Sequence, residues 1–264
     1  MLMEVRNHIK LMFISFRYNL SKEMVNRGSF IAQILFMILN NSAFILQWIV
    51  LFSLKNCIGG YDLNDILVLW ALVSASFGFS HLFFQNVYAI PHLIVTGKLD
   101  SYIVQSKNVL FNAIISGSNP SAIGDLLYGY ILIFVSGFNF YKIFMFTMFV
   151  VLGGTLLTAF LSIVGSITFW IKRGDILLRN LNNIAVCTAS YPEGIFMGAA
   201  KVLLFVIVPT GFMIYFPVRI ILAFNFTMLA SVISITLFDV LFAFWFFKLG
   251  LKKYSSSNLI ELRV

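Results

Sequence analysis

The sequence predicts an all-α integral membrane protein with about six transmembrane helices. Hydrophobic residues make up 60% of its 264 residues, charged residues only 11%, and the mean hydropathy is +0.95. A soluble domain carries about 25% charged residues, so this chain lacks the charged exterior that a fold in water needs. The apolar residues also gather in long runs, with the basic residues between them. Both patterns are typical of a chain whose solvent is lipid.

Six apolar runs predict the membrane spans. A bilayer core of about 30 Å needs about 20 helical residues. The predicted spans cover about 28–54, 65–90, 120–138, 143–171, 195–214 and 227–248. Pro91 ends the second run, and the polar sequence Lys172-Arg173-Gly174-Asp175 ends the fourth. Residues 249–264 then form a tail outside the membrane.

The basic residues predict the orientation. With the N-terminus inside, the cytoplasmic segments hold Arg6, Lys10, Arg17, Lys22, Arg27, Lys98, Lys107, Lys172, Arg173, Arg179, Lys248, Lys252, Lys253 and Arg263. The outer segments hold only Lys55, Lys142 and Arg219, while Lys201 lies within a predicted span. Fourteen against three is a positive-inside bias, so both termini are predicted to be cytoplasmic. The same distribution assigns the net charge of +8 to membrane topology rather than to nucleic-acid binding.

Residues 1–27 predict an amphipathic helix that lies flat in the inner membrane interface. As a helix, they place one apolar stripe together, formed by Val5, Ile9, Met12, Phe13, Phe16 and Leu20. Arg6, Lys10 and Arg17 lie beside this stripe. The alternative, a helix packed on a soluble core, lacks a soluble core to receive it. The apolar stretch 11–16 is too short for a signal peptide.

Three other features qualify the simple pattern of spans. Residues 172–194 are mixed in character and are predicted to lie along the cytoplasmic surface. Residues 209–226 contain Pro209 and Pro217, which break helices, so a broken or re-entrant outer segment is predicted before the last span. Small residues at four-residue spacing predict close packing of the fourth span, against this chain or another. They are Gly154, Thr158, Ser162 and Ser166.

Recognised catalytic motifs are missing from the sequence. A phosphate-binding loop needs GxxxxGK[ST], whereas the one Gly-Lys pair, Gly97-Lys98, is followed by Leu99. Neither HExxH nor GxSxG occurs, and the three histidines are scattered. We therefore predict no ATPase activity, no catalytic residue and no metal site in this chain.

Polar residues within the predicted spans leave two interpretations open. Asp239 lies near the middle of the last span, where an uncompensated charge is costly. It is either a proton or substrate site or a polar clamp between helices. Lys201 lies near the inner end of its predicted span, where it either reaches the interface or pairs with Asp239. Three further polar residues lie deep in the first two predicted spans: Asn40, Asn41 and His81. They either form hydrogen bonds with neighbouring helices or contact the transported molecule.

The loop between the second and third spans is the most informative segment. It predicts a short, partly apolar helix at about 99–104 within polar sequence. Such a helix is either a docking surface for a soluble partner or a connector lying on lipid. The pattern G-x-L-D-x-x-[LI]-x-x-x-x-N runs through it. The matching residues are Gly97, Leu99, Asp100, Ile103 and Asn108.

This pattern resembles the first cytoplasmic loop of bacterial exporter permeases of the ABC-2 family. Ser106 stands where such relatives usually have proline. The resemblance continues along nearly the whole chain, at Gly124-Asp125, Tyr191-Pro192, Ile195-Phe196, Gly198, Pro209, Pro217 and the tail 251–256.

The resemblance implies an interfacial elbow helix, six spans, a coupling helix around residues 97–108 and a re-entrant outer element. It also implies that two permease chains, identical or related, pair in the bacterial plasma membrane and that each docks a separate ABC ATPase. ATP and magnesium would bind that ATPase, and this chain would hold no cofactor. The expected function is the permease subunit of an ATP-driven exporter, which forms the translocation path. Lipid, peptide, antibiotic and polysaccharide cargo all remain open.

Two other functions compete with this one. A secondary transporter or channel would use Asp239 and Lys201 as ion-linked charges, but internal repeats and paired broken helices are missing. A membrane-embedded enzyme acting on lipid would need clustered carboxylates or histidines, and the acidic residues are scattered.

Overall fold

The computed structural model describes residues 2–105, 108–137 and 139–255, and the side chains of residues 2–6, 8 and 9 lie outside that description. Its longer helices are α1 (Leu2–Glu23), α2 (Arg27–Leu54), α3 (Leu63–Phe84), α7 (Ile123–Val135), α8 (Phe140–Ser166), α9 (Gly174–Ala189) and α12 (Phe226–Leu251). The shorter helices are α4 (Ile90–Val95), α5 (Asp100–Ile103), α6 (Val109–Ile115), α10 (Ala199–Val206) and α11 (Phe216–Leu222). Single turns of other helix types lie between them: η1 (Met24–Asn26), η2 (Gln85–Ala89), η3 (Pro120–Ala122), η4 (Ile167–Phe169), η5 (Glu193–Ile195) and η6 (Gly211–Tyr215).

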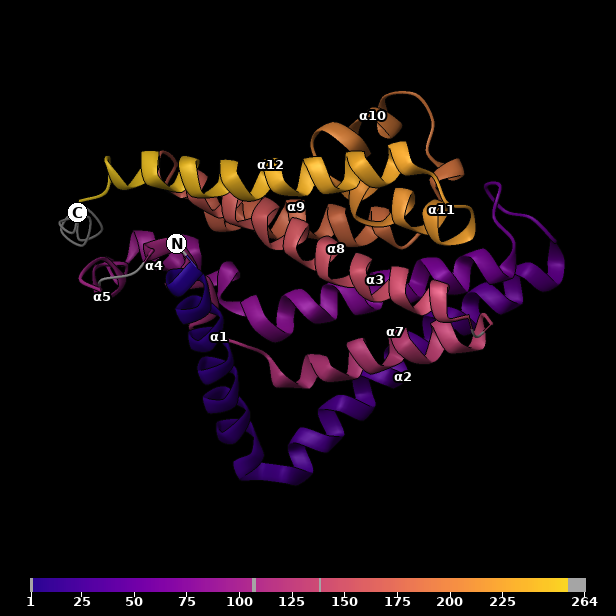
Figure 1. Ribbon diagram of the computed structural model, residues 1–264, viewed down its shortest axis with the longest axis horizontal. Helices are drawn as coiled ribbons and strands as arrows, with labels where there is room; N and C mark the ends of the chain where they lie inside the picture. The colour runs from indigo at the N-terminus through magenta and orange to yellow at the C-terminus, as the bar shows by residue number, and fades with distance from the viewer. Residues whose placement is uncertain (1, 106–107, 138, 256–264) are drawn as a thin grey trace.

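The helices form one elongated bundle (Figure 1). Helices α3, α7, α8, α9 and α12 run along its long axis. The start of α1, the short helices α4 and α5 and the end of α12 gather at one end, which we name the terminal end. Residues 55–62 and α11 lie at the other, which we name the opposite end.

Helix α3 is the centre of the bundle, where it packs against α7 and α8. Its residues 66–76 are buried except Leu67. Glycine permits the close approach of α7, because a Cβ on Gly129 would lie 2.6 Å from the Ala71 carbonyl oxygen. On α8, Thr158 shares a 2.8 Å hydrogen bond with Ser80 of α3. The small-residue face of the fourth predicted span therefore packs within this chain.

Several helices suit a membrane by length and composition. Among the described residues, four helical stretches are long and apolar enough to cross: Lys10–Leu54, Leu63–Val95, Phe140–Phe169 and Phe226–Leu251. A fifth is reached if the bent pair 199–206 and 211–222 counts as one span, and Pro120–Val135 is a shorter apolar helix. The chain is therefore an all-helical membrane protein in the part that the structure describes, with four to five candidate spans where the sequence predicted six.

The predicted fifth span, at 195–214, differs most from the structure. Instead of one helix, α10 and the segment 211–222 meet at a bend of 75°. The mixed segment 172–194 contains α9, which packs along α8 toward the opposite end and keeps its other side exposed. One face of α9 explains this: Gly174, Leu178, Ala185 and Ala189 are buried. The average hydropathy of residues 172–194 includes the polar residues of the other faces, so it did not indicate this buried face.

The second predicted span also continues further than expected. Pro91 does not end the helical segment. It lies in the first turn of α4, which follows α3 after the turn η2. Proline is tolerated in the first turn of a helix because its missing N–H has no partner there. The break at residues 85–90 therefore changes the helix geometry without ending the apolar segment, which reaches Val95.

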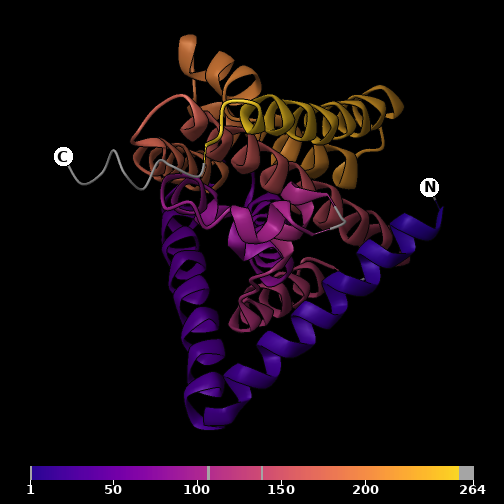
Figure 2. The ribbon, with the colours of Figure 1, turned by 90° about the vertical axis from the view of Figure 1, so that its left-hand side faces the viewer.

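Helix α1 crosses the bundle rather than joining it. Figures 1 and 2 both show α1 and α2 meeting in a V at η1, with α1 lying across the direction of the other long helices. Leu11 and Met12 pack against the core, and Phe16 contacts Phe83 of α3 with ring centroids 5.5 Å apart. The predicted stripe positions Val5 and Ile9 lie outside the described side chains.

Candidate functional site

Residues 96–105 and Asn108, between α4 and α6, form a compact projection at the terminal end. Gly97 ends α4 in the left-handed region, with φ of +72°, a conformation that glycine adopts without the steric cost of a Cβ. Leu99 follows and is completely buried. Its N–H donates to the Leu93 carbonyl at 3.1 Å. These two residues fix the start of α5 to the end of α4.

Side-chain hydrogen bonds fix α5 to α6. The Tyr102 hydroxyl lies 2.9 Å from the Ser116 hydroxyl, and the Asn112 amide donates to Gln105 Oε1 at 3.1 Å. Asn108 caps α6, because its side-chain oxygen accepts from the Phe111 N–H at 3.1 Å. The projection is therefore tied to the bundle on both sides.

Two apolar side chains are exposed on this projection, beside the exposed polar residues Lys98, Ser101, Gln105 and Asn108. Ile103 is 41% exposed and Val104 is 85% exposed, although both belong to a short polar segment. We name Ile103 and Val104 the apolar tip. Exposed apolar side chains on a rigid support are typical of contact surfaces for other proteins.

The end of α12 also reaches the projection. Burial, and then the neighbouring Asp100 carboxylate, raise the pKa of Tyr254 to about 12. Tyr254 contacts Phe169 edge-to-face, with ring centroids 6.2 Å apart, and Lys253 Nζ lies 5.9 Å from the centroid of the Trp170 ring. The predicted residue Asp100 is thus adjacent to elements that lead into α8 and α12.

The structure separates the predicted intramembrane polar residues. Asn41 is buried on α2 and its amide donates to Asp125 Oδ1 of α7 at 2.7 Å, while the Ser74 hydroxyl donates to the Asp125 carbonyl at 2.6 Å. These bonds join α2, α3 and α7. Asn40 is exposed. In the sequence, Asp125 belongs only to the pattern that resembles the family, and its contact with Asn41 depends on the register of α2 against α7.

His81 belongs to a polar chain that joins α3 to α9. His81 Nε2 lies 3.0 Å from the Tyr88 hydroxyl, which donates to Asn182 Oδ1 at 2.9 Å. The middle member, Tyr88, was not singled out in the sequence. These hydrogen bonds give Asn182 of α9 a polar partner where α9 packs against the bundle.

The suggested pairing of Lys201 with Asp239 is wrong. Lys201 Nζ lies 3.0 Å from Glu193 Oε1, and Arg219 Nη2 lies 2.5 Å from Glu193 Oε2. Glu193 is 3% exposed and lies near residues 59–61 of the opposite end, with which it lines a shallow pocket. Lys201 therefore lies beside Glu193 at the opposite end, and Asp239 is a half-buried residue of α12.

The described residues offer little for catalysis. Among them, no group of three or more His, Cys, Asp or Glu side chains is arranged to hold a metal ion. The polar contacts within the bundle connect helices, and the projection exposes the apolar tip among polar side chains. The arrangement is suited to binding another protein and to transmitting movement between helices.

Comparison with known proteins agrees with this description. A family model described as "ABC-2 family transporter protein" matches residues 38–258. No curated protein and no solved structure matches the chain. The family match covers α3 to α12 and most of α2, and it confirms the resemblance that begins at Gly97. The chain therefore belongs to the ABC-2 family of transporter proteins, the membrane permease components of ABC transporters.

Proposed function

We propose that this chain is the permease subunit of an ATP-binding cassette exporter in the bacterial plasma membrane, with a separate ATPase docked on the segment 97–108. The observation that carries the proposal is the apolar tip on a projection that is tied firmly to the bundle. A soluble ATPase that covered Ile103 and Val104 would bury apolar surface. The ATPase would supply ATP and magnesium, so this chain needs no cofactor of its own.

The contacts of α5 support a route for movement from the ATPase into the membrane. Tyr102 contacts Ser116 after α6, and Asp100 lies beside Tyr254 after α12. A displacement of α5 would therefore act on both the α6–α7 and the α8–α12 sides of the bundle. The ATPase must contact α5 differently in its two states, because a partner shifts an equilibrium only through differential binding.

The basic residues support placing the terminal end in the cytoplasm. Lys98, Lys172, Arg173 and Lys252 belong to segments at this end, which are the positions that the positive-inside rule favours. In this orientation α1 is the interfacial elbow helix, and α10 with α11 is the re-entrant outer element. The bend of 75° between 199–206 and 211–222 supports that assignment.

Helix α9 supports pairing with a second permease chain, identical or related. Asn180 and Asn183 are exposed on this helix, although α9 runs along the bundle. Polar side chains facing lipid are costly, so a second chain or a water-filled path between two chains would satisfy them. We propose that the translocation path lies beside this face.

Substitution of the apolar tip tests the docking proposal. Val104→Asp and Ile103→Asp are expected to lower ATPase retention in a pull-down at least about tenfold, since each replaces buried apolar contact by a charge. Val25→Asp is the matched control, because Val25 is 87% exposed and lies outside the projection. Unchanged retention and unchanged coupled hydrolysis in the Val104 and Ile103 variants would refute docking at this surface.

The ion-coupled alternative loses its structural motivation. It required Asp239 and Lys201 to act together, and Lys201 instead pairs with Glu193 at 3.0 Å. Uptake driven by a proton gradient in the absence of any ATPase would restore it.

A further inference from the structure

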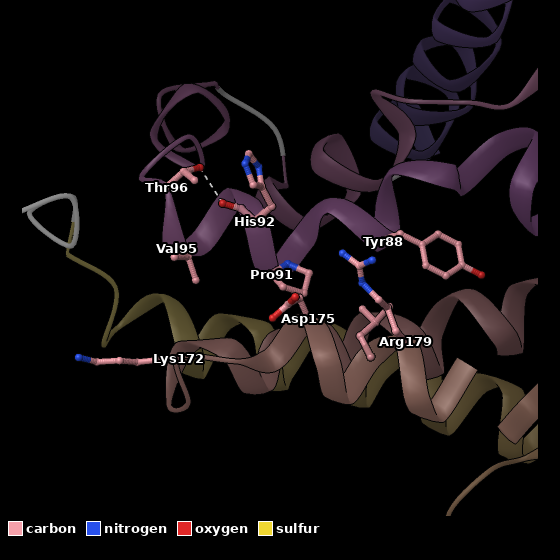
Figure 3. Close-up of a pocket in the computed structure, with 9 residues that line it drawn as sticks. Tyr88, Pro91, His92, Val95, Thr96, Lys172, Asp175 and Arg179 are labelled. Carbon is pink, nitrogen blue, oxygen red and sulfur yellow. Dashed lines mark hydrogen bonds between the residues drawn. The ribbon is translucent and has the colours of Figure 1, made fainter. Parts of the chain in front are cut away.

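A cavity opens between α4 and α9 at the terminal end. Its volume is about 430 Å³, which is large enough for a small polar group with part of a chain attached. Figure 3 shows its two walls, one from η2 and α4 and the other from the start of α9. The lining residues are Tyr88, Pro91, His92, Val95, Thr96, Lys172, Asp175, Leu178 and Arg179.

The cavity carries an excess of positive charge. Two basic residues, Lys172 and Arg179, line it together with one carboxylate, Asp175. Among the described residues, neither Lys172 nor Arg179 forms an ion pair within 4 Å, because the ion pairs there all involve Glu193. Figure 3 shows the Arg179 guanidinium directed from α9 toward α4, between Pro91 and Tyr88, whereas the Lys172 side chain extends outward from the edge of the cavity. An arginine held in this way presents a planar set of donors that matches a phosphate.

The rest of the lining is partly apolar, and Tyr88, His92 and Thr96 add polar groups to it. Pro91, Val95 and Leu178 contribute hydrocarbon to the lining. Near the lining residues in the sequence, Trp170, Ile171 and Ile176 are 39%, 42% and 46% exposed. Tryptophan next to lysine is typical of the depth at which lipid headgroups lie. A soluble anion would bind the basic side chains but would leave Pro91, Val95 and Leu178 in contact with water.

The geometry points to a binding site for the phosphate headgroup of an anionic phospholipid in the leaflet at the terminal end. Arg179 binds the phosphate, Lys172 adds a second positive charge at the edge of the cavity, and Pro91, Val95 and Leu178 contact the glycerol and the first methylenes. The site joins α4, which leads to the docking projection, with α9. A bound lipid would therefore hold these two helices together. The proposal goes beyond the permease function, and only the identity of the leaflet rests on the orientation proposed above.

Native mass spectrometry of the full chain in mild detergent tests the site, with added phosphatidylglycerol and phosphatidylcholine as probes. Phosphatidylglycerol is expected to be retained more strongly than phosphatidylcholine. Arg179→Gln and Lys172→Gln are each expected to lower its retention about fivefold, as expected for one basic residue near an anionic lipid. Lys172 precedes α9 and is exposed, so its substitution keeps the test valid if the Arg179 variant folds poorly.

Arg173→Gln is the matched control, because Arg173 is exposed next to Lys172 but does not line the cavity. Its retention of phosphatidylglycerol is expected to equal that of the unmodified protein, and millimolar glycerol 3-phosphate is expected not to displace the lipid. Equal losses in the Arg173 variant, equal retention of the two lipids, or displacement by glycerol 3-phosphate would each overturn the proposal. The last result would assign the cavity to soluble phosphates. None of these results bears on ATPase docking.

Discussion

At the scale of single residues, one buried carboxylate organises the opposite end of the molecule. Glu193 is buried, whereas its partners Lys201 and Arg219 have side chains that are 50% and 45% exposed. A backbone contact accompanies this cluster, because a Cβ on Gly194 would lie 2.1 Å from the Gly59 carbonyl oxygen. The two ion pairs and the glycine contact together hold η5 against the loop after α2 and join it to α10 and α11.

Glu193→Gln is therefore expected to destabilise the protein. The substitution removes the shared anion and leaves two neighbouring cations, at a cost of about 2 kcal/mol for charged hydrogen bonds at a partly exposed site. The apparent Tm in detergent should fall by roughly 4–8 °C. Glu23→Gln serves as the control, since Glu23 forms no ion pair among the described residues. Equal Tm values for both variants would show that the cluster does not stabilise the fold.

Tyr61 gives this region a distinct pH dependence. Burial, and then the Glu193 carboxylate, raise the pKa of Tyr61 to about 12. Because the pKa is higher in the folded than in the unfolded chain, its contribution to stability is fully present below about pH 10 and is lost as the pH rises through about 12. Tyr61→Phe should reduce the loss of stability between these pH values. Tyr18→Phe, at a residue that is 72% exposed, should leave the profile unchanged.

The sequence predicted contacts between residues that are close in sequence, but not between distant ones. The motif residues Gly97, Leu99 and Asn108 occupy one small projection because they are close in sequence, so spacing alone was informative. Glu193 and Arg219 are 26 positions apart, and Asn41 and Asp125 are 84 apart. Their partners depend on the bend between α10 and α11 and on the register of α2 against α7, which hydropathy does not encode.

At the scale of elements, the least expected feature is α9. Its polar residues lowered the hydropathy of segment 172–194, and the sequence therefore predicted a surface helix. The structure satisfies Asn182 through Tyr88 of η2 and buries the small-residue face of α9 on α8. A helix that is covered on one side by protein need not be apolar all round. A test based on the average hydropathy of a segment therefore does not detect it. The strongly apolar segments at 28–54 and 227–248, by contrast, correspond closely to α2 and α12.

The turn between α4 and α5 provides a test of how the projection is held. Gly97→Ala places a Cβ in the left-handed region, where an L-residue costs about 1–2 kcal/mol. The strain should reorient α5 and lower ATP hydrolysis coupled to the permease severalfold, measured with the ATPase bound in vesicles. Gly137→Ala is the matched control: it too has a positive φ, of +107°, but lies in the turn between α7 and α8. Equal effects of the two substitutions would indicate general destabilisation instead of a role for the projection.

At the scale of the whole molecule, the bundle has two chemically different ends. The terminal end combines basic segments with the apolar tip, and the opposite end combines the Glu193 cluster with the broken segment 199–222. Composition and the positive-inside bias were enough to predict a membrane protein and to suggest its orientation. The number of spans was less predictable, because α7 is short for a span and the segment after α9 bends.

Cysteine labelling tests the orientation without new reporter domains. Cys57 is exposed in the loop after α2, at the opposite end. In a Cys187→Ser background, a membrane-impermeant maleimide should label Cys57 in intact cells. Ser255→Cys, in a chain lacking both native cysteines, should react only after permeabilisation. The reverse pattern would place the terminal end outside and would contradict docking of a cytoplasmic ATPase there.

The central claim is that this permease moves cargo with energy from a separate nucleotide-hydrolysing partner. Its most direct test is affinity purification of the chain from its native membranes in mild detergent, followed by measurement of magnesium-dependent ATP hydrolysis in the eluate. We predict that an ATPase co-purifies with the unmodified chain, that the eluate hydrolyses ATP, and that Val104→Asp removes most of this activity while Val25→Asp retains it. An eluate without a nucleotide-hydrolysing partner, from a chain that still moves its cargo in vesicles lacking ATP, would contradict the claim.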